Sequence, residues 1–182
     1  RDSLIIYENL SGFGITRGIS FAVNHKFSTP LRIKLGTTFM DVFEQTKNSI
    51  TGEVEREEQV FAPKFSGVFA VSYELKKMGL KLNYTGKVMG RQRLPAFGEE
   101  FGKAGYSNWF SLQNIQITKS FKQNLFECFV GVKNLFNYTQ ESPLIDPQNP
   151  FGDSFDTSYA YGPLQVRRFY LGLRFGLNRK SN

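Results

Sequence analysis

The chain has 182 residues, enough for one domain with a sizeable core, and it carries a formal net charge of +7. Its mean hydropathy of -0.33 and the lack of any run of about 20 apolar residues exclude a membrane protein built from helices. Its basic residues are scattered singly along the sequence instead of forming a cluster, so we expect no nucleic acid as a partner.

Residue types that carry catalysis or bind metals are scarce. Cys128 is the only cysteine and His25 is the only histidine, so the sequence offers neither an internal disulfide nor a histidine-based zinc site or catalytic triad. Alternation places Cys128 on the same face as Phe126 and Val130, where we expect a small buried hydrophobe. No nucleophile–base pair or phosphate-binding loop is visible, so we predict no enzyme activity, no metal and no cofactor.

Apolar and polar residues alternate along most of the chain. This period predicts β-strands, because successive side chains of a strand point to opposite faces. Glycine, proline and polar clusters separate the alternating segments. In chain order, the predicted strands cover residues 2–9, 15–27, 31–46, 60–75, 80–91, 108–121, 124–136 and 167–177. The fold class that follows is all-β, with about eight antiparallel strands in a single unit spanning residues 1–182.

The predicted connections differ in length in a regular way. Those near residues 29, 77 and 122 are very short, whereas those near 53, 99 and 150 are long and polar. Short and long connections therefore alternate, so all short turns lie at one end of an up-and-down sheet and all long loops at the other. Outer-membrane barrels have short periplasmic turns and long external loops. We therefore predict a segment of an up-and-down transmembrane β-barrel in a Gram-negative outer membrane, with the lipid bilayer and lipopolysaccharide as partners.

The clearest alternation lies in the last predicted strand. One of its faces is wholly apolar and is predicted to face lipid, namely Phe169, Leu171, Leu173 and Phe175. By the same alternation, five basic side chains are expected to face the barrel lumen: Lys81, Lys87, Lys133, Arg168 and Arg174. Aromatic residues near strand ends are expected in the interfacial girdles: Tyr7, Phe27, Phe43, Tyr73, Trp109, Phe121 and Phe175.

The long loops hold the candidate ligand-binding residues. The last loop contains five aromatic residues suited to gripping an apolar or aromatic ligand, with packing inside the loop as an equal alternative: Tyr138, Phe151, Phe155, Tyr159 and Tyr161. Four arginines at predicted external strand ends are candidates for an anionic ligand or for lipopolysaccharide phosphates, with a structural fringe of charge as the alternative: Arg91, Arg93, Arg167 and Arg168. The glutamates within residues 53–58 are expected in a solvated loop rather than at a cation site.

Two stretches near the C-terminus resemble a known family. Val132-Lys133-Asn134-Leu135-Phe136 is similar to the run that precedes the last external loop of TonB-dependent outer-membrane receptors. A second stretch resembles the ending of such receptors, particularly those of Bacteroidetes-like bacteria: Tyr161-Gly162-Pro163-Leu164, then Arg168-Phe169-Tyr170-Leu171-Gly172-Leu173-Arg174-Phe175. Val166 in place of a glycine and the polar residues 178–182 depart from the family pattern.

The resemblance implies a barrel of ~22 strands filled by an N-terminal plug, of which this chain is the C-terminal part. It also implies uptake of a scarce nutrient, such as a ferric siderophore or a cobalamin-like chelate. External loops capture this small-molecule ligand, and TonB drives its uptake through the plug. Since the chain starts at Arg1 without a signal peptide, we expect it to belong to a longer polypeptide. The alternative is a passive or structural outer-membrane barrel of eight strands that closes on itself.

Overall fold

The computed structural model describes residues 12–47, 52–97, 99–121 and 125–176. These residues form an all-β structure, as predicted. Its strands are β1 (Phe13–Lys26), β2 (Leu31–Lys47), β3 (Val54–Glu58), β4 (Phe65–Leu75), β5 (Leu80–Met89), β6 (Phe110–Phe121), β7 (Phe126–Lys133) and β8 (Arg168–Phe175). Two short 3-10 helices cover Lys76–Met78 and Glu99–Phe101. In these residues, no helix is long and apolar enough to cross a membrane.

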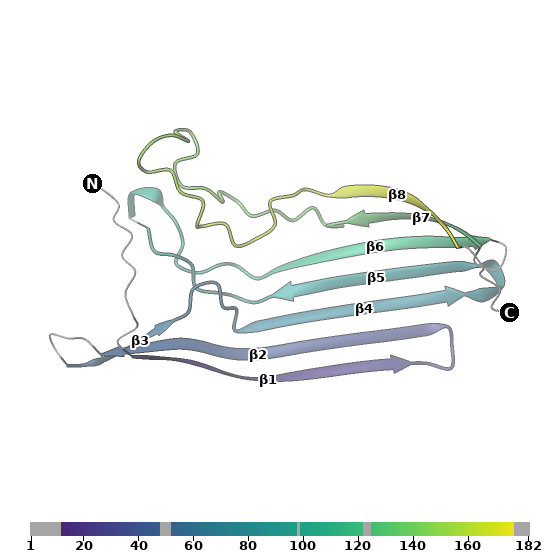
Figure 1. Cartoon of the computed structure of the whole chain (residues 1–182), viewed down its shortest axis with the longest axis horizontal. Helices are drawn as coiled ribbons and strands as arrows, with labels where there is room; N and C mark the ends of the chain where they lie inside the picture. The colour runs from purple at the N-terminus through teal and green to yellow at the C-terminus, as the bar shows by residue number, and fades with distance from the viewer. Residues whose placement is uncertain (1–11, 48–51, 98, 122–124, 177–182) are drawn as a thin grey trace.

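The strands form one antiparallel up-and-down sheet in the order β1-β2-β4-β5-β6-β7-β8, with β3 paired to β2 beside this path. Figure 1 shows the sheet edge to edge, with β1 and β8 at its opposite margins. Over the described ranges, each of these two strands has a single neighbour, so the sheet is open. The predicted up-and-down antiparallel fold is confirmed, and the sheet does not close on itself as a barrel.

Two predicted strands differ from the structure by three residues or more at one end, and one prediction cannot be compared with it. The predicted strand at residues 2–9 lies outside the described residues. The predicted strand at 60–75 starts only at Phe65, because Phe61 has a positive φ of 62° and Pro63 has no N–H to donate. The predicted strand at 124–136 ends at Lys133, since Asn134 turns the chain with a φ of 53°.

The expectation of a purely polar loop around the glutamates 53–58 was wrong, because Val54–Glu58 forms β3. Strand β2 has 17 residues, and β4 pairs with it only as far as Phe39. Beyond that point β2 would present unpaired N–H and C=O groups along its edge. Strand β3 pairs with this segment, from Phe43 to Lys47, and satisfies them.

The predicted alternation of connection lengths is confirmed. Connections 27–30 and 76–79 are short and lie at one end of the sheet, where β6 also ends at Phe121 and β7 begins at Phe126. The connections from β2 to β4, from β5 to β6 and from β7 to β8 are long and gather at the other end, on the left of Figure 1. An up-and-down meander has this geometry because each strand reverses the direction of the one before it.

The strand registers collect apolar side chains on one face of the sheet, here called the apolar face. One row of directly opposed residues crosses from β2 to β8, namely Ile33, Val71, Tyr84, Ile115, Val132 and Phe169. The parallel row is Leu31, Tyr73, Leu82, Ile117, Val130 and Leu171. Cys128 and the four residues predicted to face lipid on β8 lie on this face, as their alternation predicted.

The opposite face, here called the polar face, carries small, polar and basic side chains. Its central row is Arg32, Ser72, Asn83, Gln116, Gly131 and Tyr170. Ser72 Oγ donates to Asn83 Oδ1 at 2.9 Å, and Tyr170 OH donates to Gln116 Oε1 at 2.9 Å. The five basic residues predicted for the lumen all lie on this face by their register.

Aromatic side chains gather at both ends of the apolar face. Phe121, Phe126 and Phe175 form a chain of rings at the short-turn end, with centroids 5.5 and 5.0 Å apart. Phe39, Phe65 and Trp109 do the same toward the long loops, at 5.0 and 5.3 Å. Of the expected girdle residues, Tyr7 lies outside the described residues.

Without lipid or detergent, we expect the chain to associate in water instead of folding as a monomer. The open edges of β1 and β8 and the exposed apolar face both favour association. Sedimentation velocity after dilution from urea measures the oligomeric state. A monomer that unfolds reversibly in aqueous buffer contradicts this prediction.

Candidate functional site

The first family-like motif closes the base of the loop between β7 and β8. Asn134 is buried and adopts the left-handed conformation that asparagine tolerates. Its Nδ2 donates to the carbonyl oxygens of Tyr138 and Gln165 at 2.7 and 3.0 Å, and its Oδ1 accepts from Tyr138 N. One side chain thereby joins the two ends of a long loop. Asn137 makes a second link between the two ends, because its Oδ1 accepts a hydrogen bond from Arg167 N at 2.7 Å.

The second family-like motif is held by Gln140, which is buried. The Oε1 atom of Gln140 accepts from the backbone N–H groups of Tyr161 and Gly162, both at 2.8 Å. Its Nε2 donates to Tyr159 O, and its own backbone N–H donates to Pro163 O. The stretch that starts at Tyr161 is therefore bonded to the start of the same loop, and the two motifs that carry the family resemblance are physically connected.

The two longest loops share a small hydrophobic core. Leu94 from the β5–β6 loop packs with Ile145 and Tyr159 from the β7–β8 loop, and all three are buried. Tyr159 OH donates to Ala104 O, while Lys103 Nζ donates to the carbonyl oxygens of Ser142 and Leu144. This core makes one ordered structure of the two loops.

Most of the predicted ligand-binding aromatics take part in loop packing. Tyr138 stacks on Phe110 with ring centroids 5.3 Å apart and an interplanar angle of 2°. Tyr159 is buried and Tyr161 is half-buried, and burial raises the pKa of both phenols. Phe155 is half-buried, whereas Phe151 is 99% exposed. Ligand binding by these five residues stays a prediction, and Phe151 is the member whose ring is most accessible.

Arg91 and Arg93 belong to a network of charges, apart from these tyrosines. Arg93 pairs with Glu57 and donates to Glu58 O at 2.9 Å, and the Arg91 guanidinium lies 5.2 Å from the Tyr106 ring centroid. Lys64 hydrogen-bonds Glu58, which lowers the pKa of the Glu58 carboxyl and raises the pKa of Lys64. The network ties β3 to the β5–β6 loop. Binding of an anion by these two arginines stays a prediction.

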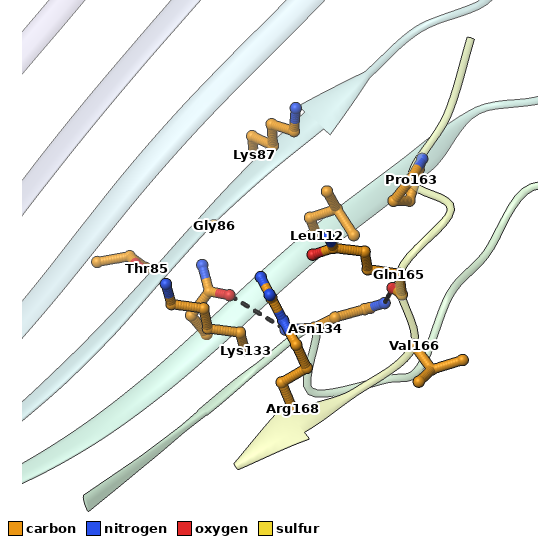
Figure 2. A pocket seen from close by; sticks show the side chains of 11 residues that line it. Thr85, Gly86, Lys87, Leu112, Lys133, Asn134, Pro163, Gln165, Val166 and Arg168 are labelled. Atoms are coloured by element: carbon orange, nitrogen blue, oxygen red, sulfur yellow. Dashed lines mark hydrogen bonds between the residues drawn. The ribbon is translucent and has the colours of Figure 1, made fainter. Parts of the chain in front are cut away.

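The polar face holds a cavity of about 350 Å³ where β5, β7 and β8 meet the last loop (Figure 2). We call it the basic cavity. Its lining residues are Thr85, Gly86, Lys87, Leu112, Asn114, Lys133, Asn134, Pro163, Gln165, Val166 and Arg168. Alternation predicted the face of Lys87, Lys133 and Arg168. Their convergence was missed, because it depends on the register of three strands that are distant in sequence.

Metal-binding clusters and buried polar side-chain atoms without partners are both absent from the described part of the chain. No group of three or more His, Cys, Asp or Glu side chains is placed to hold a metal ion there. Among the described residues, every buried side-chain nitrogen and oxygen has a hydrogen-bond partner.

The sequence matches no protein-family model, and no curated protein matches it either. The resemblance of residues 130–140 and 161–175 to TonB-dependent receptors therefore stays a prediction. What the structure adds is a physical role for these motifs, which join the two ends of one long loop.

Replacing Asn134 with alanine is expected to destabilise the folded protein by about 1–3 kcal/mol. The change leaves buried backbone groups without partners, and it places alanine at a positive φ. Urea titration in lipid vesicles measures the free energy of unfolding. Asn24→Ala, on the exposed polar face of the edge strand β1, is the matched control and should change this free energy by less than about 0.5 kcal/mol. Equal losses in the two variants contradict the role given to Asn134.

Proposed function

We propose that this chain forms the C-terminal part of the barrel wall of a TonB-dependent outer-membrane receptor. Such a receptor takes up a scarce nutrient, for which a ferric siderophore or a similar chelate is the candidate. The observation that carries the proposal is the apolar face, whose rows of apolar side chains run unbroken from β2 to β8. A barrel in a bilayer needs this outer surface.

The exposure of the apolar face supports contact with lipid. Phe169, Leu171 and Phe175 are 72–74% exposed, and no described segment covers them. Ile19, Phe21 and Val23 on the opposite edge strand are each 56% exposed. Exposed apolar surface of this extent needs an apolar environment, which the hydrocarbon core of a bilayer supplies.

The dimensions of the apolar face fit a bilayer. The distance along β4 from Phe65 to Tyr73 is about 27 Å at the usual rise per residue. The apolar band of outer-membrane barrels is about 25 Å tall and lies between two aromatic girdles. The rings of Phe39, Phe65 and Trp109 and those of Phe121, Phe126 and Phe175 occupy these two levels. Outer-membrane barrels have their short turns on the periplasmic side, and in that orientation the long loops of this chain are external.

The open sheet favours the wall of a large barrel over a small closed one. Among the described residues, β1 and β8 are not paired with each other and lie at opposite margins (Figure 1). A passive barrel of eight strands requires these margins to meet. In a barrel of ~22 strands they pair with strands outside the described residues, and the polar face lines a lumen that a plug fills.

The mechanism that we propose assigns capture to the external loops. The hydrophobic core of Leu94, Ile145 and Tyr159 holds the β5–β6 and β7–β8 loops as one ordered structure above the lumen. An ordered loop pair binds a ligand at lower entropic cost than two mobile loops. TonB acts from the other side of the membrane through the plug, which in this proposal lies outside residues 1–182.

Val23→Arg tests the assignment of the two faces. Val23 lies opposite Leu35, halfway along the apolar face, so arginine there is expected to cost roughly 2–4 kcal/mol in a bilayer. Its neighbour Ala22 lies on the polar face, opposite Gly36, and Ala22→Arg is expected to cost under about 1 kcal/mol. Urea titration of the protein in phospholipid vesicles measures both costs. A comparable loss in both variants would rule out lipid contact on this face.

Uptake in cells tests the function. The gene that contains this sequence is deleted, and accumulation of iron from radiolabelled ferric siderophores is followed under iron limitation. Uptake of at least one chelate is expected to fall to background, to return with the intact gene, and to need TonB. Unchanged uptake of every chelate tested, cobalamin included, would refute the proposal.

A further inference from the structure

We propose that the basic cavity binds a small polyanion, that is, a ligand with two or more carboxylate or phosphate groups. The inference rests on the proposed function, because the cavity adjoins the β7–β8 loop, which in that proposal lies at the external mouth of the barrel. It specifies that the ligand is negatively charged, which the proposed function leaves open. It also assigns three residues to the recognition of that charge: Lys87, Lys133 and Arg168.

The cavity concentrates positive charge without an internal counter-charge. Its lining includes two lysines and one arginine and no carboxylate. Five ion pairs occur among the described residues, and none of them includes Lys87, Lys133 or Arg168. The Lys133 ammonium lies 5.7 Å from the Tyr170 ring centroid, which orients the amine but leaves its charge in place.

The strand register places two of these positive charges side by side, which destabilises the sheet when no anion is bound. Lys133 on β7 and Arg168 on β8 are directly opposed, so their side chains start from the same face as immediate neighbours. Like charges in directly opposed positions destabilise an antiparallel pair. A bound anion attracts both cations and offsets their mutual repulsion, so the arrangement favours the occupied cavity.

Two other basic residues of the polar face each have a carboxylate as a direct neighbour. Arg174, six residues along β8 from Arg168, pairs with Glu127 at 2.9 Å. Lys81, six residues along β5 from Lys87, lies directly opposite Glu74. Lys26 and Arg32 near the short turns are also directly opposed, but the pocket that they line includes Glu74. The lining of the basic cavity contains no carboxylate.

The remaining lining residues suit a ligand with several acidic groups. Figure 2 shows Lys133 and Arg168 near each other, with Asn134 and Gln165 beside Arg168 and with Lys87 farther along β5. Thr85 also lines the cavity. The guanidinium of Arg168 offers a planar pair of donors that matches a carboxylate or phosphate. Asn134 is fixed by its bonds to Tyr138 and Gln165, which keeps this wall of the cavity ordered. A volume of about 350 Å³ accommodates an ion of the size of citrate.

Calorimetric titration with citrate tests the inference on the intact protein in phosphatidylcholine vesicles. We expect saturable binding, which Lys133→Gln weakens at least about tenfold by removing a charge-assisted hydrogen bond. The matched control is Lys81→Gln, which makes the same replacement on the same face of the sheet but outside the cavity, and should change the affinity less than about twofold. Arg168→Lys should retain part of the affinity that Arg168→Gln loses. Inorganic phosphate, titrated in the same way, distinguishes a phosphate-bearing ligand from a polycarboxylate.

Stability in the absence of citrate separates binding from a structural role. Lys133→Gln should unfold at the same urea concentration as the unchanged protein or at a higher one, because it removes the repulsion from Arg168. Citrate should then raise the urea midpoint of the unchanged protein but not that of the variant.

Two results would overturn the inference: folded, vesicle-inserted protein that shows no saturable citrate or phosphate binding, and equal loss of binding in Lys133→Gln and Lys81→Gln. The first result leaves the proposed receptor standing, because insertion is measured separately. Conversely, citrate binding by protein that fails to enter vesicles would refute the barrel and leave the anion site.

Discussion

The register between neighbouring strands is the constraint on which the other features of this protein depend. Because side chains alternate along a strand, a slip of one residue would move every apolar side chain of that strand to the polar face. The registers keep Ile33, Val71 and Ile115 in one row, and this row continues to Phe169 on the last strand. The apolar face, the polar face and the positions of the cations all follow from this pairing.

The loops show a second constraint, which is the need to satisfy backbone groups at the end of the sheet. Strand β2 is longer than β4, and β3 pairs with the edge that would otherwise be left open. Asn134 and Gln140 serve the same purpose with side chains. Asn134 bonds backbone groups from both ends of the last loop, and Gln140, near its start, bonds backbone groups near its end. The long loops are consequently ordered structures with their own small core.

The polar face combines cations that have a carboxylate neighbour with cations that have none. Near the short turns, Arg174 and Lys81 have Glu127 and Glu74 as neighbours. Next to the long loops, Lys133 and Arg168 face each other without a carboxylate. A fold that tolerates directly opposed like charges gives up some stability there, which is typical of positions selected for binding.

The sequence by itself determined the all-β class, the alternating lengths of the connections, and the face on which Leu171 or Arg168 lies. These properties are local, because the period of two and the turn residues can be read within a few positions. Strand β3 was missed, because it forms only where the unequal lengths of β2 and β4 leave an open edge. Three features were decided only by the tertiary structure: the packing of Tyr138 on Phe110, the link from Asn134 to Gln165, and the placement of Lys87 and Arg168 around one cavity. Each joins residues that are distant in the chain, and only the pairing of the intervening strands determines their separation in space.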